Sequence, residues 1–165
     1  MTVNISKKDF ERYFIKPSKT IYPLSGWKIF ITGECEEDST LIKFLLEEIV
    51  MNYGLSWKLS KEESFEVRNK KKLNQFKACT IYFPFSLIKE GKQIEVVELI
   101  SSSLKKGNYN KDLNIFGAKK IRNSIYYRYD CDIPMMEGGF SREDYLKHYK
   151  KSSSNFNIKN NKDLF

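Results

Sequence analysis

Four basic residues lie within or beside short apolar stretches of the kind that form strands: Lys28, Lys58, Lys77 and Arg128. A charged side chain is costly to bury, so each of the four should either face solvent or serve a site that binds an anion. The chain contains 24 lysines and only five arginines, and for any single lysine a solvent-facing position is the simpler explanation. As a set, the four are candidates for chemistry on an anionic substrate.

Residues for other chemistries are scarce. The sequence has no phosphate-binding P-loop, no dinucleotide-binding glycine motif, no serine-hydrolase elbow and no zinc-protease helix motif. His148 is the only histidine, which excludes a multi-histidine metal centre. Cys35, Cys79 and Cys131 are far apart and odd in number, which fits neither a disulfide framework nor a clustered zinc site. We expect Cys79 to pack as a small apolar group, and we expect no metal and no other cofactor.

The basic residues lie in local sequences whose order resembles a known family. These are Gly26-Trp27-Lys28-Ile29, Trp57-Lys58-Leu59, the stretch 77–84 and Tyr127-Arg128-Tyr129. They resemble the N-terminal lyase domain of class III lanthipeptide synthetases, in which the corresponding stretches are GWK-[IL]-H, F-K-F, GKF-x-TIYP and L-Y-V-R-Y. The resemblance spans residues 24–129 and rests on the collinear set rather than on one motif. It implies an α+β fold, a largely antiparallel sheet with flanking helices, similar to the phosphothreonine lyase effectors of bacterial pathogens.

The reaction that this resemblance implies is β-elimination of phosphate from phosphoserine or phosphothreonine in a precursor peptide, giving dehydroalanine or dehydrobutyrine. Such a site removes a weakly acidic Cα proton, stabilises enolate-like charge and holds a dianionic leaving group. By resemblance, Lys58 is the general base, and nearby positive charge would favour its neutral form. Lys28 would polarise the substrate carbonyl or assist the departing phosphate. The candidates for phosphate binding are Lys71, Lys77, Arg122 and Arg128.

Phe30 is the main departure from the family pattern. It stands two residues after Lys28, where the family has the histidine expected to act as general acid. Because alternate residues of a strand point the same way, Phe30 should share a face with Lys28 and line the pocket. Tyr82 and Tyr127 are candidate replacements for the acid, although a tyrosine on a strand more often packs. His148 lies far beyond the matching region, and we expect it on the surface of a helix.

The length of 165 residues is that of a single domain, and the formal net charge is +8. We expect a lyase domain over 1–150, with an irregular arm over 1–25, and a polar linker or chain end over 151–165 towards a following kinase domain. By the resemblance, the partners are the phosphorylated precursor peptide and the kinase and cyclase domains of the same synthetase. No apolar run approaches the roughly 20 residues needed to span a bilayer, and no signal peptide is apparent, so we expect a cytoplasmic location without membrane or nucleic-acid partners.

Strands and helices that would position these residues can be predicted in turn. Strands are predicted over 27–32, 78–83 and 125–129, with weaker ones over 55–59, over 65–68 and at Ile115. Residues 69–75 are predicted to form a loop. A helix starting in the acidic stretch 34–38 and ending near Gly54 should bury Leu41, Phe44, Leu45 and Ile49. A helix over 94–104, ending at Gly107, should bury Val96, Val97, Ile100 and Leu104. A short helix is predicted over 142–149, after a joint at Gly138 and Gly139.

Two other functions stay open. A basic nucleic-acid-binding domain would fit the charge of +8 and the many aromatic residues, but there is no RNP-like strand motif and no helix-turn-helix signature. An inactive lyase-like domain that docks the leader of the precursor peptide would fit the absence of the histidine at Phe30.

Overall fold

The computed structural model describes residues 2–4, 11–15, 21–23, 26–72 and 75–130. Their main feature is a six-stranded sheet in the order β2-β5-β6-β4-β8-β7, in which every neighbouring pair is antiparallel. Its strands are β2 (Phe14–Ile15), β4 (Gly26–Thr32), β5 (Ser56–Ser60), β6 (Lys77–Phe83), β7 (Lys119–Arg122) and β8 (Ile125–Asp130). The helices are α2 (Glu36–Asn52), α3 (Glu62–Lys70), α4 (Phe85–Lys89) and α5 (Gln93–Lys106). The predicted α+β class with an antiparallel sheet is therefore confirmed.

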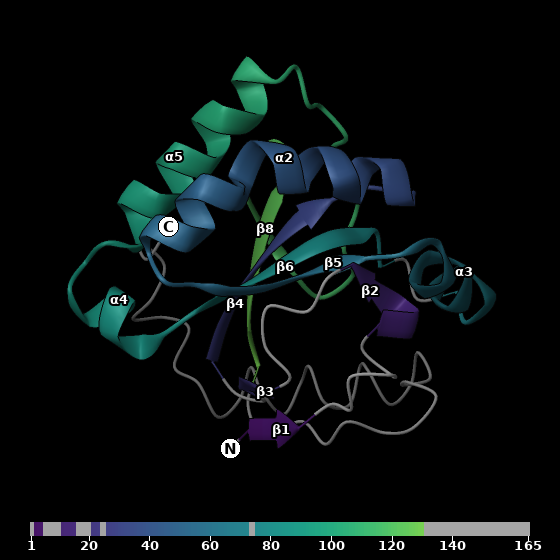
Figure 1. Cartoon of the computed structure of the whole chain (residues 1–165), viewed down its shortest axis with the longest axis horizontal. Coiled ribbons are helices and arrows are strands. Elements are labelled where there is room, and N and C mark those ends of the chain that lie inside the picture. The colour runs from purple at the N-terminus through teal and green to yellow at the C-terminus, as the bar shows by residue number, and fades with distance from the viewer. Residues whose placement is uncertain (1, 5–10, 16–20, 24–25, 73–74, 131–165) are drawn as a thin grey trace.

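The two long helices cover one face of the sheet. Figure 1 shows α2 and α5 side by side above the strands, with α3 at the end of β5 and α4 at the opposite end, where β6 ends. On β4, Trp27, Ile29 and Ile31 point towards these helices and join the main hydrophobic core. Phe30 points the other way and forms a separate buried cluster with Ile115. This alternation follows from the two-residue period of a strand, and it leaves the second face of the sheet for the residues between the core positions.

The three strong strand predictions are confirmed as β4, β6 and β8, and the weaker stretch 55–59 forms most of β5. At Ile115 there is only an isolated bridge to Gln75. The strand predicted over 65–68 is wrong, because these residues lie in α3, and the loop predicted over 69–75 begins inside the last turn of that helix. Helix α3 has Glu62 and Glu63 in its first turn and basic residues in its last turn, which stabilises both ends of the helix dipole.

Helix α2 is confirmed, and of the four residues predicted to be buried on it, Leu45 and Ile49 are partly buried against the main core. Ile42, Leu46 and Val50 are buried, whereas Leu41 and Phe44 are exposed. Apolar residues occur on most sides of this helix, so the contacts with the sheet and with α5 decide which side packs. Helix α5 has one clear apolar side. It buries the four predicted residues and ends at Gly107 as predicted.

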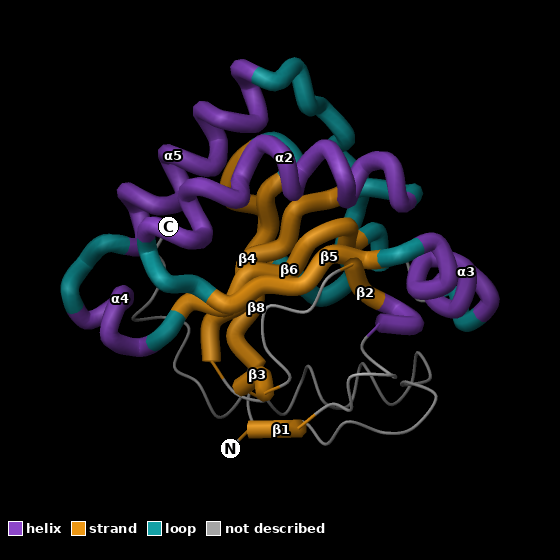
Figure 2. The backbone as a smooth tube through the Cα atoms, viewed as in Figure 1, coloured by secondary structure: helices purple, strands orange, loops and turns teal. Residues whose placement is uncertain are grey.

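The N-terminal arm, which we predicted to be irregular, contains short strands in its described parts. Strand β1 (Thr2–Asn4) pairs with β3 (Ile21–Pro23), and β2 extends the main sheet by pairing with β5. Figure 2 shows these strands with the rest of the backbone. Strands of two or three residues are too short to show an alternating pattern. The predictions for Cys131, Gly138, Gly139, the helix over 142–149 with His148, and the segment 151–165 fall outside the described residues. No described helix is both long and apolar enough to cross a membrane.

Candidate anion-binding site

The register of the strands brings the predicted basic residues onto the sheet face that points away from α2 and α5. On β4, Lys28 lies opposite Arg128 of β8 on one side and opposite Tyr82 of β6 on the other. Two residues further along, Phe30 lies opposite Thr80. Alternate residues of a strand share a face, so the predicted placement of Phe30 on the side of Lys28 is confirmed.

Two aromatic rings organise the basic side chains. Nζ of Lys28 lies 5.6 Å from the centroid of the Tyr82 ring, and Nζ of Lys58 lies 5.9 Å from the same centroid. At the neighbouring ring of Phe30, Nζ of Lys77 is 5.0 Å and Cζ of Arg128 is 5.1 Å from the centroid. Each ring therefore contacts two cations. We call the whole set the basic cluster, and its members are Lys28, Phe30, Lys58, Lys77, Tyr82 and Arg128.

Burial differs between the rings and the cations. Phe30 is 1% exposed and Tyr82 is 5% exposed, whereas the four cationic side chains are half-buried. A cation over an aromatic ring contributes about 0.5–1 kcal/mol at a partly exposed position. A second effect is unfavourable. Lys28 and Arg128 lie directly opposite each other, and like charges across neighbouring strands destabilise a sheet. A dianionic group such as a phosphate, bound between them, would interact favourably with both charges.

Arg68, which the sequence analysis did not single out, fixes the start of β6. From α3, its guanidinium donates hydrogen bonds to the backbone oxygen of Lys77 at 2.6 Å and to Oγ of Ser60 at 2.9 Å. The Ser60 hydroxyl donates to the same Lys77 oxygen at 2.8 Å. Burial lowers the pKa of Arg68 to about 10, so the guanidinium remains charged at neutral pH. These bonds tie α3, the end of β5 and the start of β6 together, and they hold the backbone that carries Lys77.

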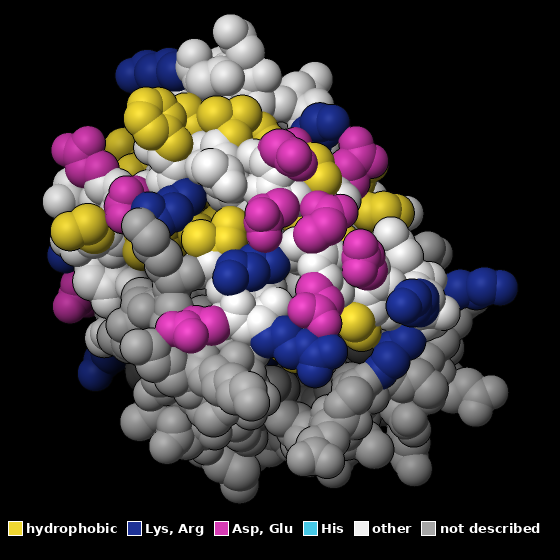
Figure 3. Space-filling view, turned by 45° about the vertical axis from the view of Figure 1, so that its right-hand side comes forward, with side chains coloured by type: hydrophobic (Ala, Val, Ile, Leu, Met, Phe, Trp, Pro, Cys, Tyr) yellow, Lys and Arg dark blue, Asp and Glu magenta, His cyan; other side chains and the backbone are white. Residues whose placement is uncertain are grey.

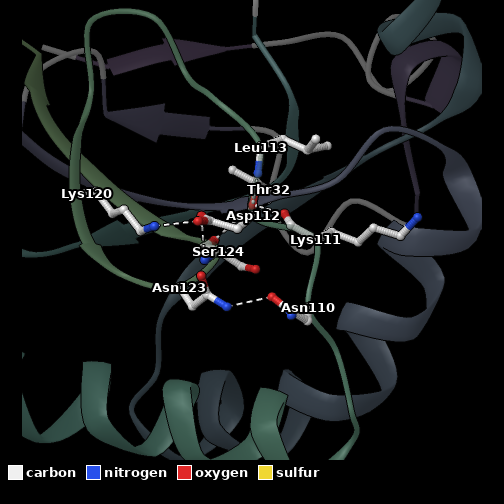
Figure 4. Close-up of polar contacts among 8 residues, drawn as sticks. All are labelled: Thr32, Asn110, Lys111, Asp112, Leu113, Lys120, Asn123 and Ser124. Carbon is white, nitrogen blue, oxygen red and sulfur yellow. Dashed lines mark hydrogen bonds and ion pairs between the residues drawn. The ribbon is translucent and has the colours of Figure 1, made fainter.

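A second polar network fixes the hairpin between β7 and β8. The Thr32 hydroxyl donates to the backbone oxygen of Lys111, and Oδ1 of Asp112 accepts a hydrogen bond from the Ser124 N–H at 3.1 Å (Figure 4). Lys120 forms an ion pair with Asp112. Ser124 has a φ of +64°, which a non-glycine residue adopts only when its surroundings hold it there. The network anchors the start of β8, and β8 carries Arg128.

Two of the predicted site residues, Arg122 and Tyr127, lie elsewhere. Arg122, on β7, forms an ion pair with Glu98 of α5 and so belongs to the helix side of the sheet. Tyr127 packs on Trp27 with ring centroids 5.7 Å apart, in the main core. Arg128, the next residue of β8, faces the basic cluster, so the side chain of Tyr127 points to the other face of the sheet. Lys71 is the cap residue at the end of α3, outside the strands. The structure therefore does not bring Arg122 or Tyr127 to the basic cluster.

Phe14 is another residue that sequence reasoning missed. Its ring lies 4.6 Å from Nζ of Lys58, so the N-terminal arm contributes to the surroundings of this lysine. The two-residue strand that carries Phe14 shows no periodicity, and nothing in the sequence links it to Lys58. For Arg68 the sequence does contain an indication, because this arginine follows the apolar Phe65 by three residues. In the structure, Cζ of Arg68 lies 5.6 Å from the centroid of the Phe65 ring.

Cys79 lies on the helix side of β6 and is 1% exposed, which confirms its predicted packing. Burial raises the pKa of its thiol. Within the described ranges, no group of three or more His, Cys, Asp or Glu side chains is arranged to hold a metal ion.

The chain as a whole matches no protein-family model and no curated protein at a significant level. The function is therefore inferred from the arrangement of the basic cluster.

Proposed function

We propose that this chain is a phosphoserine/phosphothreonine lyase domain that eliminates phosphate from a lanthipeptide precursor peptide. The observation that supports it best is the convergence of Lys28, Lys58, Lys77 and Arg128, from four different strands, on one face of the sheet. These are the residues that carry the resemblance to the class III synthetases. A fold similar to the phosphothreonine lyase effectors, a cytoplasmic location, and kinase and cyclase domains as partners belong to the same proposal.

In the proposed reaction, the neutral amine of Lys58 removes the Cα proton of the phosphorylated residue. The electron pair left on Cα forms the double bond to Cβ, and the bond from Cβ to the phosphate oxygen breaks. Lys28 stabilises the negative charge that develops on the substrate carbonyl oxygen. Lys77 and Arg128 hold the phosphate, the arginine through two parallel hydrogen bonds. Arg122 has no role in this scheme, because it pairs with Glu98, whereas Lys71, the cap residue of α3, stays a candidate for phosphate binding.

The leaving phosphate requires a proton or full neutralisation of its charge, and Phe30 supplies neither. We assign the proton donor to Tyr82, because both Lys28 and Lys58 border its ring. The two nearby cationic groups would stabilise the phenolate left after donation. The proton that Lys58 has taken from Cα then returns to the phenolate, which restores both groups for the next turnover. The proposed cycle needs no cofactor.

The test is mass spectrometry of synthetic phosphothreonine and phosphoserine peptides after incubation with the full chain. Elimination removes phosphoric acid and lowers the peptide mass by about 98 Da, whereas hydrolysis would lower it by about 80 Da. We expect Lys58→Ala and Lys28→Ala to fold and to reduce elimination at least about a hundredfold. Lys105→Ala, at an exposed position on α5, is the matched control and should leave the rate unchanged.

Other outcomes separate the alternatives. Peptide binding that depends on the phosphate but is followed by no elimination would favour an inactive docking domain. Sub-micromolar binding of DNA or RNA, with no preference for phosphorylated peptides, would overturn the lyase proposal in favour of a nucleic-acid-binding domain. Added salt weakens all of these interactions, so salt dependence alone does not distinguish them.

A further inference from the structure

The outer side of α2 exposes an apolar stripe. Leu41 is 40% exposed, Phe44 is 82% exposed and Met51 is 72% exposed. Their spacing of three and seven residues places them along one side of the helix. Single exposed apolar residues are ordinary on a protein surface, but three large ones aligned on one helix are typical of an interaction site.

The stripe continues towards α5. The Ser103 hydroxyl on α5 donates a hydrogen bond to the backbone oxygen of Leu45 at 2.5 Å, so this side of α5 borders α2. Leu99 lies one turn before Ser103 on the same side of α5 and is 41% exposed. The exposed apolar surface therefore involves both long helices and can contact more than one turn of a partner.

Acidic residues outnumber basic ones on α2. Helix α2 contains five carboxylates and a single lysine, although the chain as a whole has a net charge of +8. Glu37, Glu47 and Glu48 are exposed among the apolar residues of its outer side. Figure 3 shows hydrophobic and acidic side chains next to one another on this face of the molecule, with several basic side chains between them. The basic cluster lies on the opposite face of the sheet from α2, so the carboxylates of α2 are separated from it by the sheet.

From this charge pattern we infer that the outer side of α2, with Leu99 of α5, is a docking surface for a basic amphipathic helix of a partner protein. Apolar residues of such a helix would cover Phe44 and Met51, and its flanking lysines or arginines would pair with Glu48 and with Glu47, whose carboxylate lies 3.4 Å from Nζ of Lys43 and would then be shared. The same glutamates would repel an anionic membrane, a nucleic acid or the α2 of a second copy. The inference is independent of the lyase proposal, because it uses none of the residues of the basic cluster.

The experiment compares two synthetic helical peptides of about 18 residues, enough for about five helical turns. Both carry leucine along one side, and the remaining positions are lysine in one peptide and glutamate in the other. Each is labelled and titrated with the full chain, and binding is followed by fluorescence anisotropy. We expect the lysine peptide to bind at least about tenfold more tightly than the glutamate peptide. Equal affinities would overturn the inference.

Variants then locate the binding surface. Phe44→Ser and Met51→Ser change side chains that are mostly exposed, so both should fold, and each should weaken binding of the lysine peptide at least about fivefold. The control is Ile94→Ser, which removes an exposed apolar side chain from α5 and should leave binding unchanged. A double variant Glu47→Lys and Glu48→Lys should reverse the preference between the two peptides.

Two further outcomes contradict the inference. If Phe44→Ser leaves lysine-peptide binding unchanged in a folded chain, the peptide binds elsewhere. If sedimentation shows that the chain self-associates and that Phe44→Ser abolishes this, the surface is an interface between copies. Peptide binding and sedimentation do not involve phosphate elimination, so their results are valid whether or not the lyase proposal fails.

Discussion

The buried ring of Phe30 is shared by two cations, with Nζ of Lys77 at 5.0 Å and Cζ of Arg128 at 5.1 Å from its centroid. An apolar side chain thus stands at the centre of a group of charges, at the position where the lyase domains that the sequence resembles have a histidine. The ring positions the cations but cannot exchange a proton with the substrate.

Replacing Phe30 with histidine should therefore keep or increase elimination while lowering stability by roughly 1–3 kcal/mol, because a polar side chain replaces a buried apolar one. In the proposed mechanism Lys58 acts as a base only when neutral, so the wild-type rate should rise with pH. The Phe30→His variant should add a loss of rate above about pH 6.5, where a histidine acid deprotonates. Rates measured at several pH values check this. A folded Phe30→His variant without activity, beside an active Phe30→Leu control, would contradict it.

Removing only the hydroxyl of Tyr82, by Tyr82→Phe, should lower the elimination rate at least about a hundredfold. The ring and its contacts with Lys28 and Lys58 remain, so the fold should be unchanged by circular dichroism. Adding Phe30→His to this variant should restore part of the rate, because a second proton donor then faces the same group of cations. Normal turnover by Tyr82→Phe would show that the hydroxyl is not the acid.

Substituting Arg128 with lysine preserves the charge but removes the planar fork that binds phosphate through two hydrogen bonds. We expect a phosphothreonine peptide to bind at least about tenfold more weakly, as measured by isothermal titration calorimetry. The matched control is Arg12→Lys, since Arg12 is exposed and pairs with Glu63. Equal affinities for the wild type and Arg128→Lys would exclude a bidentate role.

Gly33 joins β4 to α2 at a point with no room for a side chain. A Cβ at this position would lie 2.7 Å from Cβ of Ala78 and 2.9 Å from Cβ of Asp38. Gly33→Ala should therefore destabilise the fold by about 1–3 kcal/mol in urea unfolding. Gly54→Asn is the control, because Gly54 has open space around it and asparagine tolerates its positive φ. Equal stability of both variants would mean that the backbone at Gly33 relaxes freely.

The pKa of Asp112 is held below its usual value: partial burial opposes this shift, but the hydrogen bonds from Lys120 and from the Ser124 N–H outweigh it. A lowered pKa in the folded state stabilises the fold above the unfolded pKa of about 3.9, and this contribution is lost as the pH falls through the folded value. The stability difference between the wild type and Asp112→Asn should therefore shrink between pH 6 and pH 3. Urea unfolding at both values measures it, and a difference that does not change with pH would contradict the assignment.

The parts of the fold that could be predicted from the sequence are those with a strong local pattern. The strand over 27–32 combines aromatic and β-branched residues, and the helix over 94–104 has one apolar side, so both were found with nearly correct ends. The orientation of α2 could not be predicted, because its apolar residues occur on several sides and only the contacts with the sheet choose among them. The short stretch 65–68 was misassigned because Phe65 and Val67 favour a strand in isolation, whereas the charges at the two ends of α3 favour a helix.

Most residues of the basic cluster could be predicted from the sequence, but their contacts with one another could not. Alternation along a strand placed Phe30 beside Lys28, and it also separates Tyr127 from Arg128, although the sequence analysis still kept both as candidates. Which strands are neighbours depends on long-range pairing, so nothing local indicated that Arg122 would reach Glu98 of α5. Phe14 and Arg68 act through contacts with distant residues, which a reading of local patterns does not detect.

The pairing of β4 with β8 also has a consequence for how the protein folds. Strand β4 comes early in the chain and lies at the centre of the sheet, whereas its neighbour β8 is the last described strand to leave the ribosome. The chain between β4 and β8 is long, and closing this loop costs conformational entropy before the contacts between the two strands compensate for it. The pairing of β4 with β8 is therefore intrinsically slow. Until β8 arrives, one edge of β4 has unpaired backbone groups, and a chain in synthesis exposes that edge to other chains. Because Arg128 enters with the same strand, the basic cluster is completed only when this edge is closed, and an unfinished chain lacks the pairing of Lys28 with Arg128.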